Sequence, residues 1–144
     1  MAIKSVSPED AQAAVAAGAL YIDVRSEREF EEGHPPGALN VPLLHYGADG
    51  SVTPNAEFTL VMQRVFARSA PLVLGCHSGN RSLQAARQLE RAGFTELSEM
   101  SAGWDGARDA FGRLTPGWVR RGLPVETGAP PGSSYAEVRA RTRR

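Results

Sequence analysis

Short apolar runs alternate with helix-forming segments along most of this chain, and this alternation is the feature that most restricts its fold. Three runs stand out, ALYIDV at 19–24, PLVLG at 71–75 and LSEM at 97–100, with helical apolar spacing between them. Buried parallel strands have this short, apolar character, and each needs a crossover, usually a helix, to reach the next strand. The pattern therefore predicts an α/β domain with a mostly parallel sheet.

Capping and turn residues set the limits of the other elements. Ser7 followed by Pro8 is typical of a helix start, and Ser26 is expected to cap a short helix that ends near Gly33. The other expectations are strands at 3–6 and 38–41, helices at 56–68 and 82–92, a surface loop over 43–54, and a short helix near 106–111.

Composition narrows the class of protein. The 144 residues carry 16 basic and 16 acidic side chains, a balance that argues against nucleic-acid binding. One cysteine excludes an intrachain disulfide, and with three histidines it does not give zinc-site spacing. No apolar run is long enough to span a bilayer, and the N-terminus does not resemble a signal peptide. We expect a cytoplasmic protein, and the arginine- and alanine-rich composition favours a bacterial source.

The chain is expected to divide near residue 126. Residues 1–126 hold the predicted strands and helices, whereas residues 127–144 begin with a Pro/Gly-rich linker, TGAPPGS. Ser134 and Glu137 have the spacing of a helix cap for one terminal turn. The arginines that close the chain are expected to form a short solvated tail.

The residues with the most chemical information follow the strand at 71–75. Cys76 stands at the carboxyl end of this strand, where ligand crevices of α/β proteins lie and where the next helix presents unpaired N–H groups. Gly79 permits a tight curl that aims loop N–H groups inward, and Arg81 adds a fixed cation. We therefore expect Cys76 to act as a nucleophile rather than as a small core residue.

Three segments in register give the chain a resemblance to the rhodanese (sulfurtransferase) family. They are the loop CHSGNRS at 76–82, the stretch YIDVRSEREFEEGHPPGALNVPL at 21–43, and GLPV at 122–125. The resemblance spans roughly residues 3–126. It implies a rhodanese-like domain with about five parallel strands and helices on both faces, and an activity that needs no metal or organic cofactor.

The resemblance also implies a reaction. Cys76 would take a sulfane sulfur from thiosulfate or a similar donor as a persulfide and pass it to cyanide, a thiol or a protein. Arg81 would position the anionic donor and steady its charge. The loop residues expected to bind the substrate are His77, Ser78, Gly79, Asn80 and Ser82.

Two other functions use the same cysteine. A non-catalytic module could relay a persulfide supplied by a partner protein, with negligible turnover of free thiosulfate. A phosphate or arsenate enzyme is the second alternative, but four residues separate Cys76 from Arg81. Cysteine phosphatases of related fold have five, so the shorter loop favours a persulfide.

Several residues around the loop are expected to support it. Asp23 and Arg25 lie at the end of a strand, at the same sheet edge as Cys76, and the resemblance implies that they are conformational supports; Arg25 could pair with Glu29 if that segment is helical. His34 is expected to stabilise the HPPG turn. The stretch 105–116 resembles an insertion that alters the pocket rim, and Trp104 and Trp118 are expected in the core or the pocket wall.

Overall fold

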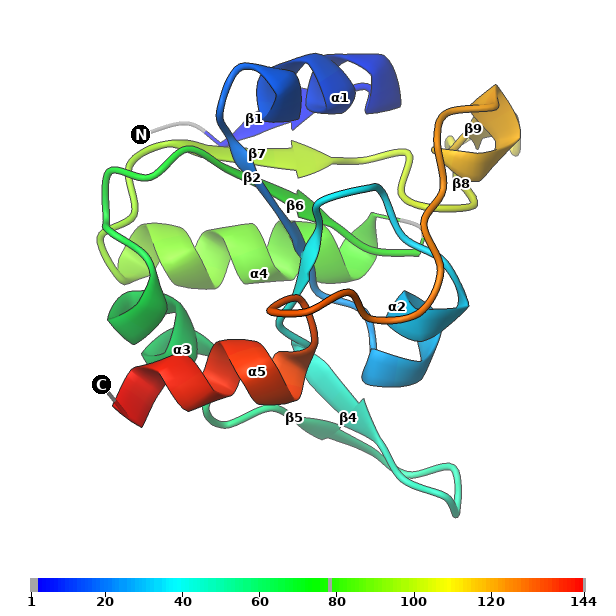
Figure 1. Ribbon diagram of the computed structural model, residues 1–144. Helices are drawn as coiled ribbons and strands as arrows, with labels where there is room; N and C mark the ends of the chain where they lie inside the picture. Colours follow the sequence, from blue (N-terminus) through cyan, green and yellow to red (C-terminus); the bar gives the residue numbers. More distant parts are fainter. Residues whose placement is uncertain (1–2, 78, 144) are drawn as a thin grey trace.

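A five-stranded parallel sheet forms the centre of the computed structural model, which describes residues 3–77 and 79–143 (Figure 1). The strand order is β1-β7-β6-β2-β3. The strand bounds are β1 (Lys4–Val6), β2 (Leu20–Asp23), β3 (Leu39–Asn40), β6 (Leu72–Gly75) and β7 (Leu97–Met100). The predicted fold class is confirmed: β2, β6 and β7 coincide with the three apolar runs, and β1 and β3 lie within the strands predicted at 3–6 and 38–41.

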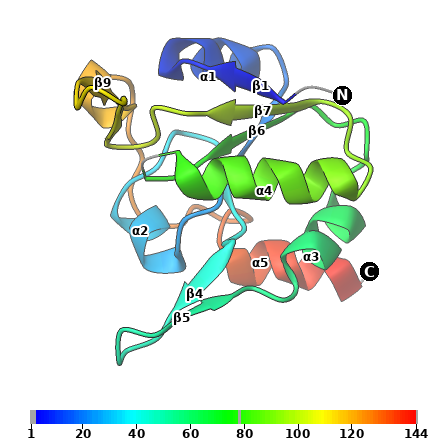
Figure 2. The same cartoon turned by 180° about the vertical axis from the view of Figure 1, so that it is seen from behind.

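Helices cover both faces of the sheet. Helix α1 lies over one face, α3, α4 and α5 lie over the other, and α2 stands near the carboxyl ends of the strands (Figures 1 and 2). The helix bounds are α1 (Pro8–Ala16), α2 (Glu27–Glu32), α3 (Phe58–Val65), α4 (Asn80–Arg91) and α5 (Tyr135–Ala140), with 3-10 turns η1 (Val119–Arg121) and η2 (Arg141–Arg143).

The caps that the sequence predicts are present. The Ser7 hydroxyl accepts a hydrogen bond from the Asp10 amide, and Ser26 forms a reciprocal capping box with Glu29. Helix α4 begins two residues earlier than predicted, at Asn80, because Gly79 ends the loop with φ of 98°. This left-handed conformation turns the chain directly from the loop into the helix.

Alternating residues of the central strands build two separate cores. Ile22, Leu72 and Leu74 pack toward α3, α4 and α5, whereas Tyr21 and Val73 face α1. A sheet that is buried on both faces explains why its strands read as continuous apolar runs rather than as alternating ones.

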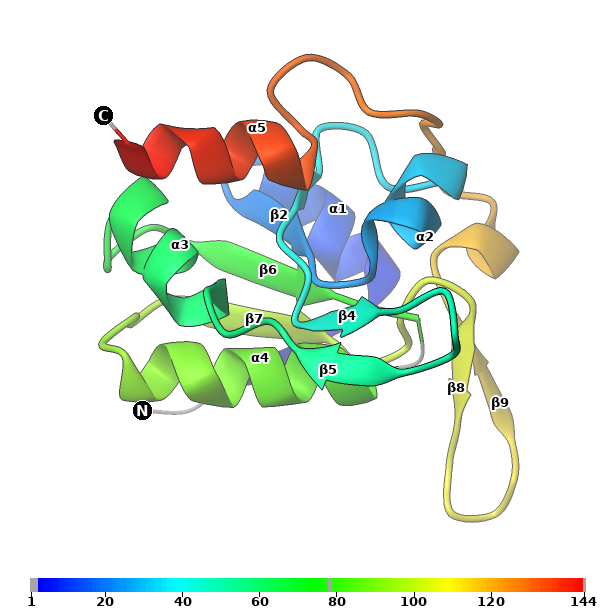
Figure 3. The same ribbon diagram turned by 90° about the horizontal axis from the view of Figure 1, so that it is seen from below.

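Two segments differ from the sequence prediction, and both are hairpins. The expected loop over 43–54 contains β4 (Leu44–Tyr46) paired with β5 (Val52–Pro54), and the expected helix near 106–111 is instead β8 (Gly106–Arg108) paired with β9 (Leu114–Pro116). In the second hairpin the Asp109 carboxylate accepts the amides of Phe111 and Arg113, each at 2.9 Å. These bonds stabilise a turn and compete with a helix. In Figure 3, both hairpins lie on the side of the molecule toward which the arrow of β6 points.

The C-terminal segment is more than a solvated tail. Tyr135 and Val138 of α5 are buried in the core that faces α3, and the Arg139 guanidinium lies 2.8 Å from the Glu57 carboxylate. The cap at Ser134 is confirmed. Part of the expected tail is therefore packed against the domain. The division near residue 126 stays a prediction. Among the described residues, no helix has the length and apolar character needed to span a membrane.

Candidate active site

Two polar groups contact the sulfur of Cys76 at the end of β6. The side chain is 1% exposed, and the Gly79 amide donates to Sγ over 3.0 Å. The Ser82 hydroxyl in the first turn of α4 lies 3.4 Å from the same sulfur. This arrangement agrees with the predicted inward curl of the loop and can stabilise negative charge on sulfur.

The loop backbone is tied to the chain that follows β7. The amide of Trp104 donates to the Cys76 carbonyl over 2.7 Å, and the amide of Asp105 donates to the His77 carbonyl over 3.1 Å. Asp105 directly precedes the β8–β9 hairpin, whose first strand begins at Gly106. The predicted insertion at 105–116 therefore starts in direct contact with the cysteine loop.

Arg81 contacts an acidic side chain of α2. Its guanidinium donates to both Glu29 oxygens, at 2.8 and 3.0 Å, and lies 5.7 Å from the ring centre of Tyr46. Burial alone would raise the pKa of Glu29, but hydrogen bonds from Arg81 and Ser26 lower it to about 2. Burial opposes the charged form of Arg81, yet Glu29 and, more weakly, Cys76 raise its pKa. The Arg81–Glu29 pair therefore joins the first turn of α4, directly after the loop, to α2.

The remaining predicted site residues have different surroundings. Ser82 is buried next to the sulfur, whereas His77 and Asn80 are exposed at the loop surface and at the first residue of α4. Ser78 lies outside the described residues. Gly79 supplies the amide that contacts the sulfur.

Asp23 and Arg25 have the contacts of supporting residues. Their buried side chains form a two-pronged ion pair, with the shortest N–O distance 2.7 Å, and Arg25 also donates to the Gly33 carbonyl and stacks on Trp104. These contacts connect the end of β2 to the end of α2. The possible Arg25–Glu29 pair does not form, because Arg25 precedes helix α2 and pairs with Asp23, and Glu29 bonds to Arg81 instead.

His34 also holds the turn that follows α2. Its ring is fully buried and stacks on Phe30 with 3.8 Å between ring centres, and its nitrogens contact the Phe30 carbonyl and the Glu126 carboxylate. Trp118 is buried as predicted and donates to the Pro124 carbonyl. Trp104 is half-buried.

Sequence reasoning missed the roles of two acidic residues at this site. Glu29 was considered only as a helix residue and a possible partner of Arg25, although its position three residues after Ser26 is that of a capping box. Glu99 is 6% exposed and lies 3.4 Å from the Ser82 hydroxyl. A charged residue inside the apolar run LSEM was the available signal.

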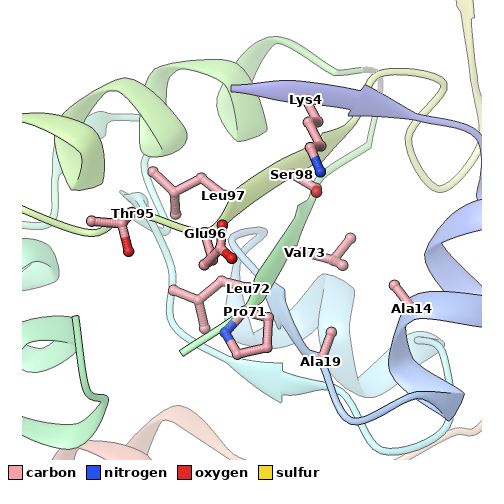
Figure 4. A pocket seen from close by; sticks show the side chains of 10 residues that line it. All are labelled: Lys4, Ala14, Ala19, Pro71, Leu72, Val73, Thr95, Glu96, Leu97 and Ser98. Atoms are coloured by element: carbon pink, nitrogen blue, oxygen red, sulfur yellow. The ribbon is translucent and has the colours of Figure 1, made fainter. Parts of the chain in front are cut away.

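A cavity lies elsewhere in the molecule. It has a volume of about 260 Å³, lies at the amino ends of the strands where Leu72 and Leu97 begin β6 and β7, and is also lined by Lys4 and Glu96 (Figure 4). Ligands of parallel sheets bind beyond the carboxyl ends of the strands, which is where Cys76 lies. We therefore assign the chemistry to the loop and not to this cavity.

The Arg81–Glu29 ion pair predicts that the stability of the protein depends on pH. Replacing Arg81 by Ala is expected to lower the free energy of unfolding by about 1–2 kcal/mol at pH 7, less than the full pKa shift implies because both side chains are partly exposed. A lowered carboxyl pKa stabilises the fold above the ordinary value of 4.5, and this stabilisation is lost as the pH falls toward 2. Urea unfolding of both proteins at neutral and acid pH measures the difference.

Arg139→Ala is the matched control for this prediction. Arg139 forms a similar bidentate pair with Glu57, but both side chains are nearly half exposed. Its loss should cost less than about 1 kcal/mol. A destabilisation by Arg81→Ala that stays the same from neutral pH to about pH 3 would contradict the assigned role of Glu29.

Comparison with known proteins agrees with this geometry. The "Rhodanese-like domain" family matches residues 7–110. Thiosulfate sulfurtransferase 16 of Arabidopsis thaliana is 35% identical over 122 residues, which cover 85% of this chain and 92% of the relative. The thiosulfate sulfurtransferase GlpE of Haemophilus influenzae is 25% identical over 88% of this chain and 98% of its own.

Solved structures have the same fold. Rv0390 of Mycobacterium tuberculosis superimposes with a TM-score of 0.71 and 29% identity, covering 89% of this chain and all of that protein. The human single-domain sulfurtransferase TSTD1 gives 0.58 and 25%, covering 72% of this chain and 93% of its own. With the cysteine loop, the parallel sheet and the family match in agreement, this chain belongs to the rhodanese-like domain family.

Proposed function

We propose that this protein is a thiosulfate sulfurtransferase that carries sulfur as a persulfide on Cys76. The single observation that carries the proposal is the Sγ of Cys76, buried at the end of β6 and contacted by the Gly79 amide at 3.0 Å. Relatives named thiosulfate sulfurtransferase support the choice of donor. The chain has no second cysteine, so one sulfur must both accept and donate.

The proposed reaction has two displacements at sulfur. The Cys76 thiolate attacks the sulfane sulfur of thiosulfate, a new S–S bond forms, and the S–S bond of the donor breaks as sulfite leaves with its electron pair. A thiophilic acceptor then attacks the outer sulfur of the persulfide. Cyanide leaves as thiocyanate, a thiol leaves as its persulfide, and the Cys76 thiolate is restored.

The loop supplies the electrostatic part of the proposal. The Gly79 amide and the amino end of α4 lie at the sulfur, so they are already placed to stabilise the negative charge of the persulfide. The charge of Arg81 favours the anionic donor and the thiolate. Because Glu29 already accepts two hydrogen bonds from Arg81, we propose that Arg81 acts through its charge and by fixing the loop.

Intact-protein mass spectrometry tests the proposal. After incubation with thiosulfate, the protein should gain the mass of one sulfur atom, and subsequent cyanide should remove it and release an equal amount of thiocyanate. Peptide mapping should locate the sulfur on Cys76. No gain with thiosulfate would reject this donor. If a persulfide-carrying protein then loaded Cys76, the chain would be a relay module rather than an enzyme for free thiosulfate.

A further inference from the structure

Glu99 is a buried carboxyl group beside the candidate active site that the proposed reaction does not use. It lies on β7, and its Oε2 is 3.4 Å from the hydroxyl oxygen of Ser82. The same hydroxyl oxygen is 3.4 Å from the sulfur of Cys76. A single hydroxyl group therefore connects the carboxyl group to the nucleophile.

The surroundings of Glu99 do not neutralise its charge. Burial raises the pKa of Glu99, and hydrogen bonds from Ser5 of β1 and Ser82 of α4 compensate only in part. Among the described residues, no lysine, arginine or histidine side chain forms an ion pair with Glu99. An uncompensated buried carboxylate is costly and is therefore sensitive to the charge of its neighbours.

The charged groups of the adjoining elements have other partners or positions. Lys4 of β1 is aligned with Ser98, the residue before Glu99, and therefore points to the opposite face of the sheet, where it lines the cavity of Figure 4. Arg81 of α4 is bound to Glu29. From β6, Cys76 is the titratable group on the other side of Ser82.

The hydroxyl of Ser82 has more acceptors than hydrogens. It can donate to the Gly79 carbonyl at 2.9 Å, to Glu99 at 3.4 Å, or to an ionised sulfur of Cys76 at 3.4 Å. An ionised Glu99 competes for this hydrogen and repels a second negative charge on the sulfur. A protonated Glu99 instead donates to the Ser82 oxygen and no longer accepts the hydroxyl hydrogen, which leaves only the Gly79 carbonyl to compete with the sulfur for it.

We propose that Glu99 is a positioning residue that sets, through the Ser82 hydroxyl, the pH range in which Cys76 is ionised. The carboxylate opposes the thiolate, and its protonation or removal favours it. The proposal rests on Cys76 as the nucleophile of the proposed function. It assigns to Glu99 no contact with donor or acceptor, only control over the charge of the sulfur.

Replacement of Glu99 by Gln tests the inference. The thiolate has its own ultraviolet absorbance, and Cys76 is the only cysteine, so a pH titration of the folded protein reports on this sulfur alone. The Cys76→Ser form of each variant serves as the blank. The midpoint of thiolate formation should fall by about half to one pH unit in Glu99→Gln, because a nearby negative charge is removed. Glu99→Met removes the same charge and replaces Gln if that variant does not fold.

Glu96→Gln is the matched control, since it removes one carboxylate from an exposed position next to β7. It should move the midpoint by less than about 0.2 pH unit, because solvent screens an exposed charge. An unchanged or higher midpoint in Glu99→Gln, or an equal shift in Glu96→Gln, would overturn the proposal.

The role of the hydroxyl is tested in a Ser82→Ala background. Without the Ser82 oxygen, the shift caused by Glu99→Gln should fall by at least half, and an undiminished shift would overturn the role of Ser82. The pH profile of sulfur transfer should move in the same direction as the titration. The titration needs no sulfur donor, so a failed sulfurtransferase assay and a failed inference give separate results.

Discussion

Replacement of Cys76 by Ser is expected to abolish sulfur transfer, with a loss of at least about 10³-fold in turnover, and to leave the fold intact. A hydroxyl is close in size to the thiol and can accept the hydrogen bond from the Gly79 amide. It does not ionise at neutral pH and cannot form a persulfide, so both displacements are lost. Thiocyanate release under steady-state conditions measures the effect.

The stability of the Cys76→Ser protein is the control for this substitution. Sγ is 1% exposed in a packed site, and exchange of one atom should change the free energy of unfolding by no more than about 1 kcal/mol. Urea unfolding of the two proteins checks this. A folded Cys76→Ser protein that kept a tenth of the turnover would contradict the assigned nucleophile, and an unfolded one would contradict the expected intact fold.

Substitution of Gly79 by Ala is expected to cost about 2–4 kcal/mol of stability and to slow sulfur transfer at least about 10²-fold. Gly79 has φ of 98°, and a Cβ at this position would collide with the backbone oxygen of Ser101. The loop must therefore move, and the amide that donates to Cys76 moves with it. Turnover and urea unfolding, measured on the same protein, test both parts.

Gly37→Ala is the control that separates the effect of backbone strain from the effect of the steric clash at Gly79. Gly37 has a similar φ of 83°, but a Cβ there meets nothing within 4 Å. Its substitution should cost about 1 kcal/mol through backbone strain alone and should leave turnover nearly unchanged. Equal effects of the two substitutions would show that the position of the Gly79 amide does not matter for the chemistry.

Local patterns were sufficient for the sheet and for the cysteine loop. The runs at 19–24, 71–75 and 97–100 became β2, β6 and β7 because strands buried on both faces must be apolar throughout. The Ser7 and Ser26 caps formed because their hydrogen bonds join residues three apart. Cys76 and Gly79 came together for the same reason, since they lie in one short loop.

The two hairpins escaped prediction because their stabilising contacts are not visible as a pattern. The strands of the β8–β9 hairpin are exposed or half-buried, so no apolar alternation marked it, and Phe111 at its tip is 85% exposed. The turn depends on one side chain, Asp109, that accepts two amides. In the β4–β5 hairpin, the Asp49 carboxylate accepts a hydrogen bond from the amide of Ser51 in a similar way.

The parallel sheet, the family and the position of Cys76 could be predicted from the sequence, because they depend on periodicity, caps and one contiguous loop. The charges that meet around that loop depend instead on tertiary packing. Glu29 and Arg81 are 52 residues apart, and Ser82 and Glu99 are 17 apart. Such pairs depend on how α2, α4 and β7 pack, and nothing in local spacing distinguishes the possible Arg25–Glu29 pair from the Arg81–Glu29 pair that forms.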